Sequence, residues 1–272
     1  MGLTERRRTL REQTAPNFEV YAVRYATRRA RRAEHFYGHD PHDGPMPMDY
    51  FVWAAVSSDH TVVVDTGFTA EVAARRGRKH LRRPVEGLEA LGIDCARVPY
   101  VLLTHLHYDH VGNLEDFPAA TFVVQEEEMA FWTGRYAGKE QFRTLIETGD
   151  VLYLVRENFR GGLRFVAGSQ EILPGIEVHR TGGHSAGLQV VRVKTARGNV
   201  VLASDATHFY ANIEEDRPYS IVSDLAQMYG AFDLVLALAD SPDHVVPGHD
   251  PLVMERFPPA REGLEGVAVR IA

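Results

Sequence analysis

The sequence predicts an α/β protein in which two mixed β-sheets are covered by helices. Strand-like segments follow one another in hairpins and are interspersed with helical segments. This order fits a pair of sheets better than a regular series of βαβ units. The chain has 272 residues, of which 44% are hydrophobic and 25% charged, an ordinary composition for a globular enzyme. We see no linker that would divide the chain, so we expect a single domain over residues 1–272.

The first strands and loops are predicted from residue type and from the positions of turn-forming residues. Met1–Pro16 is polar, and we expect it to be a loose N-terminal arm. Phe18–Tyr25 is rich in β-branched and aromatic residues, which is typical of a strand. Residues 35–50 contain Gly, Pro and Asp and are predicted to form a loop that could line a substrate cleft. Phe51–Ser58 and Thr61–Gly67 are separated by two residues, which predicts a hairpin.

The remaining elements are predicted in the same way. Pro84 is a helix start signal, so Val85–Gly92 is expected to be helical. Two further helices are expected at Glu126–Tyr136 and Ile221–Phe232, whereas residues 233–239 fit a helix or a strand. Short apolar segments predict further strands at Tyr100–Leu103, Thr121–Gln125, Leu163–Gly168, Ile176–Arg180, Leu188–Thr195 and Asn199–Asp205.

Charge and composition exclude several classes of protein. Lys and Arg number 30 and Asp and Glu 37, which gives a net charge of −7. A nucleic-acid or anionic-membrane binder needs a basic face, so we expect neither partner. No apolar run is long enough for a membrane span, and no apolar stretch follows the basic N-terminus as in a secretory signal. The single Cys95 excludes an intramolecular disulfide. We therefore expect a cytoplasmic protein, and a homo-oligomer is compatible with the sequence.

The chemistry is concentrated in the segment Thr104–His110, which directly follows an apolar strand. On an extended segment the side chains of His105 and His107 point to the same side, so they can bind one cation together. If the chain then turns, Asp109 and His110 project towards a second position. Imidazole and carboxylate ligands suit Zn²⁺ and related metals. The sequence therefore predicts a metal site at this strand end.

Three more residues of the same chemical types follow predicted strands. His184 comes after Gly182 and Gly183, Asp205 ends an apolar strand, and His249 follows a Pro-Gly turn. Taken singly, Asp205 could cap a helix and His249 could be a turn residue. Together with the cluster they form a set of seven ligand-type residues, as expected of a site assembled by loops at one sheet edge.

This set resembles the metallo-β-lactamase superfamily, whose signature is His-x-His-x-Asp-His followed by separate His, Asp and His. The resemblance extends over roughly Thr61–Pro251 and includes Val64–Gly67, which looks like the early Asp-x-Gly turn of the family. It implies an αβ/βα sandwich with two Zn²⁺ per chain, other divalent metals being compatible. His105, His107 and His184 would hold the first metal, Asp109, His110 and His249 the second, and Asp205 would bridge them.

Within the superfamily the pattern is most similar to the N-acyl homoserine lactonase family. The similarity rests on His105–Asn113, Ser204–Ala206 and Pro247–Pro251. It implies a metallohydrolase of carboxylic ester bonds whose substrate is a small-molecule lactone, in a catabolic or quorum-quenching role. A hydroxide bridging the two metals would attack the lactone carbonyl. Asp109 would serve both as a ligand and as a proton shuttle to the leaving alkoxide.

One departure from the lactonase pattern concerns the substrate. Many homoserine lactonases carry a Tyr three residues after the bridging Asp, and this chain has His208 there, with Tyr210 two residues further on. We expect His208 or Tyr210 to orient the substrate by a hydrogen bond, with a plain packing role as the alternative for both. The departure also predicts a lactone other than an acyl homoserine lactone.

Two alternatives use related metal sites. A thioester hydrolase of the glyoxalase II type has the same ligands but also a helical glutathione-binding domain, for which 272 − 249 = 23 residues after His249 are too few. A persulfide dioxygenase uses fewer ligands than the seven present here. The basic segment Arg75–Arg83 is interpreted as a solvated face, with an anion-binding patch as the alternative.

Overall fold

Two mixed β-sheets make up the centre of the molecule. The computed structural model describes residues 15–38 and 40–272. The predicted loose arm therefore lies almost entirely outside the described residues. Of its last two residues, Ala15 is buried, and its carbonyl oxygen accepts a hydrogen bond from Lys194.

The larger sheet has eight strands, seven of them in the order β13-β1-β2-β3-β5-β6-β7 and β4 beside β1. Strands β1, β2, β3, β4 and β13 pair antiparallel, whereas β3, β5, β6 and β7 pair parallel. The strands are β1 (Glu19–Arg28), β2 (Met48–Val56), β3 (Thr61–Val64), β4 (Lys79–His80), β5 (Tyr100–Leu102), β6 (Thr121–Gln125), β7 (Leu163–Val166) and β13 (Ala268–Arg270).

The smaller sheet has five strands in the order β12-β11-β10-β9-β8. Only the β11–β12 pair is parallel. The strands are β8 (Gln170–Leu173), β9 (Ile176–Arg180), β10 (Gln189–Thr195), β11 (Gly198–Ser204) and β12 (Val245–Pro247). Both sheets are thus mixed, as the order of hairpins and helices along the sequence predicts.

Strand alternation explains why the two sheets stack with helices outside them. Successive side chains of a strand point to opposite faces. In β2, Phe51 and Trp53 enter the core between the two sheets, whereas Tyr50 and Val52 enter the core under the first helical layer. In β11, Val200 and Leu202 face the first sheet, whereas Val201 and Ala203 face a helix on the other side. Both sheets are therefore buried on both faces.

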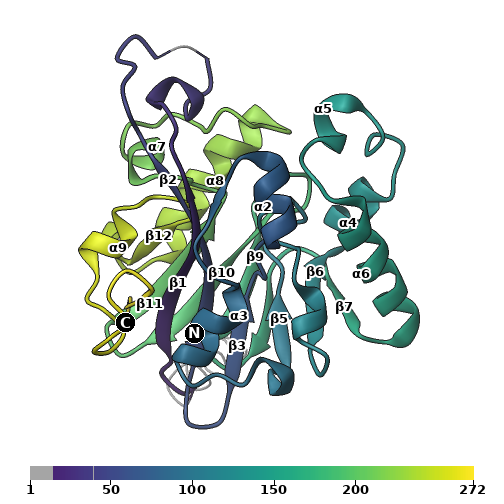
Figure 1. Cartoon of the computed structure of the whole chain (residues 1–272), viewed down its shortest axis with the longest axis vertical. Coiled ribbons are helices and arrows are strands. Elements are labelled where there is room, and N and C mark those ends of the chain that lie inside the picture. Colours follow the sequence, from purple (N-terminus) through teal and green to yellow (C-terminus); the bar gives the residue numbers. More distant parts are fainter. Residues whose placement is uncertain (1–14, 39) are drawn as a thin grey trace, which may run out of the picture.

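Helices cover both outer faces (Figure 1). The outer core of the larger sheet includes residues from α2 (Ala70–Arg76), α3 (Pro84–Ala90), α4 (Glu126–Trp132) and α6 (Thr148–Arg160). The smaller sheet packs against α8 (Leu225–Leu238). The shorter helices are α5 (Glu140–Arg143), α7 (Tyr210–Glu214) and α9 (Val253–Arg256). Single 3₁₀ turns lie at Arg32–Glu34, Cys95–Arg97, Leu114–Asp116 and Pro242–His244.

The structure adjusts several predicted boundaries. The helix predicted for Glu126–Tyr136 ends at Trp132, two residues before Gly134. The helix predicted from Ile221 begins at Leu225, because the Asp224 side chain accepts a hydrogen bond from the Gln227 amide and so caps the helix. It continues to Leu238, so the segment that fitted a helix or a strand is helical. Met48–Tyr50, at the end of the predicted loop, already belongs to β2.

Several strands end at the same edge of the sandwich. Strands β3, β5 and β6 run parallel, so their carboxyl ends meet there, and β11 and β12 form a second parallel pair. The chain segments that leave β3, β5, β11 and β12 contain Asp65, His105, Asp205 and His249. Topology therefore brings residues from four distant parts of the sequence to one edge.

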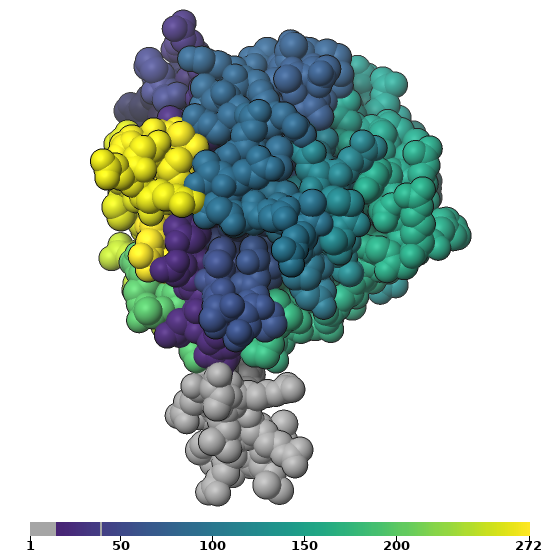
Figure 2. Space-filling model, turned by 60° about the horizontal axis from the view of Figure 1, so that its bottom comes forward, coloured from purple at the N-terminus to yellow at the C-terminus, as the bar shows by residue number. Residues whose placement is uncertain are grey.

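The two ends of the described chain lie beside each other. β13 pairs with β1, so the C-terminal residues, yellow in Figure 2, lie against the purple N-terminal strand. Within the described residues no helix is both long and apolar enough to span a bilayer.

Two glycines on helices provide a matched test of this packing. A Cβ on Gly87 of α3 would collide with Cγ1 of the buried Val23 in β1, whereas a Cβ on Gly230 of α8 would meet nothing within 4 Å. Alanine favours a helix over glycine by about 1 kcal/mol. We therefore expect Gly230→Ala to raise the free energy of unfolding by up to about 1 kcal/mol. Gly87→Ala should lower it by about 1–3 kcal/mol, because overpacking exceeds the helical gain.

Urea unfolding of both variants measures the difference. A Gly87→Ala protein as stable as the Gly230→Ala protein would contradict the close packing of α3 on β1.

Candidate metal centre

The carboxylate of Asp205 lies at the centre of the predicted site. Its Oδ2 is 3.0 Å from His184 Nε2 and 3.6 Å from His105 Nε2. Its Oδ1 is 3.0 Å from His249 Nε2 and 3.3 Å from His110 Nε2. Oδ2 also lies 3.0 Å from His208 Nε2, so each oxygen faces a different set of histidines. This is the arrangement that one carboxylate needs to contact two cations at once.

All seven residues predicted as ligands come together in two adjacent groups. His105, His107, His184 and Asp205 form one group whose ligand atoms lie within 4.8 Å of one another. Asp109, His110 and His249 form the second on the same criterion, which Asp205, His208 and His249 also meet, so that His208 is a further candidate ligand. This division is the one that the resemblance implies for the first and second metal. The role of these residues as ligands stays a prediction, since the geometry shows their proximity only.

Hydrogen bonds behind the rings aim several histidines at the centre. His184 Nδ1 donates to the Ile221 carbonyl and His249 Nδ1 to the Asp49 carbonyl, both at 2.9 Å. A ring that donates from Nδ1 keeps a lone pair on Nε2, the atom that faces Asp205. The Nε2 atoms of His184 and His249 are therefore acceptors, as metal ligands must be.

Asp65 holds the rings of the first motif in place. His110 Nδ1 donates to Asp65 Oδ2 at 2.7 Å, and the Thr104 amide and hydroxyl both donate to the same carboxylate at 2.8 Å. Thr104 Oγ1 is in turn 3.1 Å from His105 Nδ1. Asp65 has a φ of 61°, a left-handed conformation that non-glycine residues rarely adopt. This turn after β3 is the one that resembles the early Asp-x-Gly turn of the family.

The buried donor set fits divalent cations. His105 Nε2, His249 Nε2 and Asp205 Oδ1 are buried and lack any hydrogen-bond partner, which is costly unless something binds there. Burial lowers the pKa of His105 and His107 well below the ordinary histidine value, so both rings are neutral at pH 7. Burial opposes ionisation of Asp205, but the surrounding histidines, His208 first, hold its pKa well below the usual range. Burial opposes protonation of His110, but the neighbouring Asp205 and Asp65 raise its pKa well above the ordinary value. The neutral His105 and His107 rings beside a carboxylate are ligands that zinc accepts.

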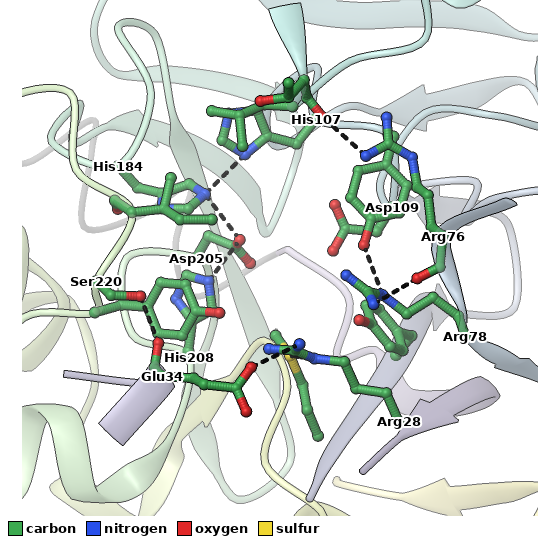
Figure 3. Close-up of a pocket in the computed structure, with 17 residues that line it drawn as sticks. Arg28, Glu34, Arg76, Arg78, His107, Asp109, His184, Asp205, His208 and Ser220 are labelled. Atoms are coloured by element: carbon green, nitrogen blue, oxygen red, sulfur yellow. Dashed lines mark hydrogen bonds and ion pairs between the residues drawn. The ribbon is translucent and has the colours of Figure 1, made fainter. Parts of the chain in front are cut away.

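A cavity of about 290 Å³ opens onto this centre (Figure 3). His107, Asp109, His184, Asp205 and His208 line it. Of the segment predicted as a cleft-lining loop, residues 35–50, Met48 and Tyr50 line the cavity, although both belong to β2. Small-molecule sites typically have volumes of about 300–1,000 Å³, so this cavity suits a small ligand.

The two predicted substrate-orienting residues lie in different places. His208 is buried at the cavity, with Nε2 at 3.0 Å from Asp205 Oδ2, and its ring stacks on that of Tyr219 at 3.4 Å between centroids. Tyr210 lies instead in a separate hollow, where the Arg256 guanidinium covers its ring at 3.7 Å. The structure does not bring Tyr210 together with the other site residues, because it begins α7 and packs into the core between the sheets.

The interpretation of Arg75–Arg83 as a solvated basic face is wrong for two of its residues. Arg76 and Arg78 line the cavity. They lie at the end of α2 and just after it, where Gly77 turns the chain with a φ of 64°. The run of basic residues in the sequence could not show that these two arginines line the cavity. The turn at Gly77 sets which arginine side chains point towards it.

Glu128 is a site residue that the sequence analysis missed. Its fully buried Oε1 accepts hydrogen bonds from the Leu106 amide and Trp132 Nε1 at 2.9 and 2.7 Å. Its Oε2 accepts from the Ser185 hydroxyl and the Gly187 amide at 2.8 and 2.7 Å. One carboxylate thus joins the segment carrying His105 and His107 to the segment carrying His184. In the sequence it is one of three consecutive glutamates, with no signal that sets it apart.

Comparison with protein families supports this geometry. The model of the metallo-beta-lactamase superfamily matches residues 46–249, which include every residue of the two groups described above.

Individual relatives are more distant. N-acyl homoserine lactonase AttM of Rhizobium johnstonii is 29% identical over 192 residues, which cover 65% of this chain and 68% of that protein. N-acyl homoserine lactonase AiiA of Bacillus thuringiensis subsp. kurstaki is 28% identical over 139 residues, 51% of this chain and 50% of that protein. The chain thus spans about half to two thirds of the length of these relatives.

A solved structure has the same fold. It is that of an N-acyl homoserine lactone hydrolase with the product N-hexanoyl-L-homoserine bound at its catalytic metal centre. It superposes with a TM-score of 0.74 at 18% identity, covering 90% of this chain and 98% of that one.

The role of Glu128 can be tested against a neighbour. In Glu128→Gln an amide NH₂ replaces one acceptor oxygen, so two of the four donors face another donor. Each buried donor without an acceptor costs about 1–3 kcal/mol of stability. We expect a clear loss in the free energy of unfolding, measured by denaturant titration.

Glu126→Gln is the matched control, because Glu126 lies exposed in the same first turn of α4. It should change stability by no more than about 0.5 kcal/mol. Equal stability of the two variants would show that Glu128 does not join the two segments.

Proposed function

The chain belongs to the metallo-beta-lactamase superfamily, and on that basis we propose that it is a metal-dependent hydrolase that opens a lactone ring. The observation that carries the proposal is the position of Asp205 between the two ligand groups, with Oδ2 3.0 Å from His184 Nε2 and Oδ1 3.0 Å from His249 Nε2. The lactonase names of the relatives described above support the substrate class.

We propose two zinc ions per chain as the physiological cofactor, other divalent metals being able to replace them. His105, His107 and His184 would hold one ion, Asp109, His110 and His249 the other, and Asp205 both. Two such ions supply activated water as a nucleophile and polarise the carbonyl oxygen under attack.

The chain's own residues would position the substrate and carry the proton. Water oxygen adds to the lactone carbonyl carbon, the ring C–O bond breaks, and the alkoxide must gain a proton to give the hydroxy acid. Asp109 lines the cavity, and its Oδ1 and Oδ2 lie 3.9 Å from His110 Nε2 and 3.8 Å from His249 Nε2. A carboxylate in that place can pass the proton from the attacking water to the alkoxide.

His208 is the residue proposed to orient the substrate. Burial lowers its pKa well below the ordinary value, so the ring is neutral. Its stacking on Tyr219 fixes the ring plane against the cavity wall. A neutral imidazole has one N–H, and Nε2, which faces Asp205 at 3.0 Å, could donate it to a lactone oxygen if Asp205 is engaged by the metals. Tyr210 has no part in this proposal, because it lines another hollow.

The cavity volume of about 290 Å³ supports a small lactone as the substrate. It is at the lower end of the usual range for small-molecule sites, so we propose a ring without a long acyl chain. The thioester and persulfide alternatives are less favoured, because the relatives described above are named as lactonases.

A substrate panel on the zinc-loaded protein tests the proposal. We expect small lactones to be opened, as measured by proton release. Long-chain acyl homoserine lactones should not be the best substrates. Chelation should abolish the reaction, and zinc should restore it. We expect Asp205→Asn to lower metal affinity or activity by about tenfold to a hundredfold or more. Losses of that size follow even when a residue that only contacts a metal ligand is replaced. Rapid thioester cleavage without opening of any lactone would refute the proposal.

A second experiment addresses His208. We expect His208→Ala to lower kcat/KM on the preferred lactone by about tenfold or more, if a transition-state hydrogen bond of about 1.4 kcal/mol is lost. Metal content, measured by elemental analysis, should stay that of the wild type. His42→Ala is the control, since His42 is exposed. Loss of metal from His208→Ala would instead make His208 a ligand, which its distance from Asp205 would also allow.

A further inference from the structure

One wall of the cavity carries an unbalanced positive charge at Arg78. On this ground we propose that the substrate is a lactone bearing a carboxylate, and that Arg78 binds this carboxylate. The inference rests on the proposed lactonase function and adds the substrate class to it.

The hydrogen bonds of Arg78 leave part of its guanidinium free. Its Nε donates to the Tyr108 hydroxyl at 3.1 Å and its Nη1 to the Arg76 carbonyl at 2.7 Å. A guanidinium has five N–H donors in a planar fork. Among residues 15–38 and 40–272, no acceptor engages Nη2 and no carboxylate lies within ion-pair distance of Arg78. A fork with an unused edge suits a carboxylate, which it can bind through two parallel hydrogen bonds.

The two neighbouring arginines of the cavity differ in this respect. Arg28 forms an ion pair with Glu34 at 3.1 Å. Arg76 pairs at 2.9 Å with Glu147, which it shares with Arg75, and also donates to the Thr144 carbonyl. Both arginines thus have a carboxylate partner in the chain. Of these cavity arginines, Arg78 is the one that has no carboxylate partner in the described part of the chain.

The rest of the cavity does not offer that partner. Its acidic members are Glu34, which is paired with Arg28, and Asp109 and Asp205, which belong to the candidate metal groups. Two divalent cations would more than offset the last two carboxylates. The loaded cavity would therefore be strongly positive, and an anionic substrate would be attracted to it.

Arg78 is held at a fixed position relative to the metal centre. Its amide donates to the Ala73 carbonyl at 2.8 Å, which anchors it to the end of α2. Its side-chain partner Tyr108 lies between the predicted ligands His107 and Asp109 in the sequence, and the Arg76 guanidinium covers the Tyr108 ring at 3.8 Å. Figure 3 shows Arg76 and Arg78 across the cavity from His184 and His208. A carboxylate on Arg78 would thus set the position of the ring at the metal centre.

Arg78 could instead serve only to hold Tyr108 in place. A structural role of that kind would affect every substrate alike, whereas a carboxylate site affects charged substrates selectively. A test must therefore compare two substrates that differ in charge alone.

A five-membered lactone with a carboxylate on the ring and its primary amide form such a pair. With the zinc-loaded wild type we expect kcat/KM for the carboxylate to exceed that for the amide by about tenfold or more. That ratio corresponds to about 1.4 kcal/mol. Arg78→Gln should reduce the ratio to near one, mainly through KM, and Arg78→Lys should keep part of it, because lysine retains the charge without the fork. Arg75→Gln, which removes an exposed arginine of α2 outside the cavity, should leave the ratio unchanged.

Equal losses on both substrates in Arg78→Gln, or no preference in the wild type, would overturn the proposal. If the wild type opens neither lactone, the panel described above decides on the lactonase function, and binding tests the carboxylate site by itself. Calorimetry with tetrahydrofuran-2-carboxylate, which has no scissile carbonyl, should show affinity for the zinc-loaded wild type at least about tenfold above that of Arg78→Gln. Equal affinities would place the carboxylate on the metals alone and overturn the proposal.

Discussion

The buried carboxylate of Asp205 is the constraint on which the site depends. Asp205 directly follows β11 of the smaller sheet, yet its two carboxylate oxygens face histidines from both sheets. A buried charge is costly unless it is paired, so the rings around Asp205 must be held close to it. The carboxylate therefore joins the two halves of the sandwich at the edge where the chemistry is expected.

Holding several imidazoles around one carboxylate requires support from behind each ring. The Ile221 and Asp49 carbonyls accept from His184 and His249, and Asp65 accepts from His110. Asp49 lies in β2 and Asp65 just after β3, so strands of the larger sheet orient rings that face a carboxylate of the smaller one. Such supports fix both the tautomer and the direction of each ring. The strained φ of Asp65 is consistent with this demand, since strained backbone is often found at functional sites.

Much of this organisation could be predicted from local sequence. The hairpin of β2 and β3, the helix after Pro84 and the cluster of ligand-type side chains after β5 depend on neighbouring residues, and the structure has all three. The roles of Glu128 and Tyr219 could not be predicted. Glu128 accepts hydrogen bonds from segments more than ten residues away in the sequence, and Tyr219 acts through ring stacking on His208. The place of Arg78 in the cavity could not be predicted for a related reason, because the direction of its side chain depends on the turn at Gly77. Tyr210, close to Asp205 in sequence, points into another core.

Anomalous X-ray diffraction from crystals of the zinc-loaded protein would locate the metals relative to Asp205. We expect two zinc peaks per chain, about 3.5–4 Å apart as in other two-metal sites, with one oxygen of Asp205 bound to each. The first peak should contact His105, His107 and His184, and the second Asp109, His110 and His249. A single peak, or two peaks of which only one contacts Asp205, would contradict the claim that this carboxylate unites two metal sites.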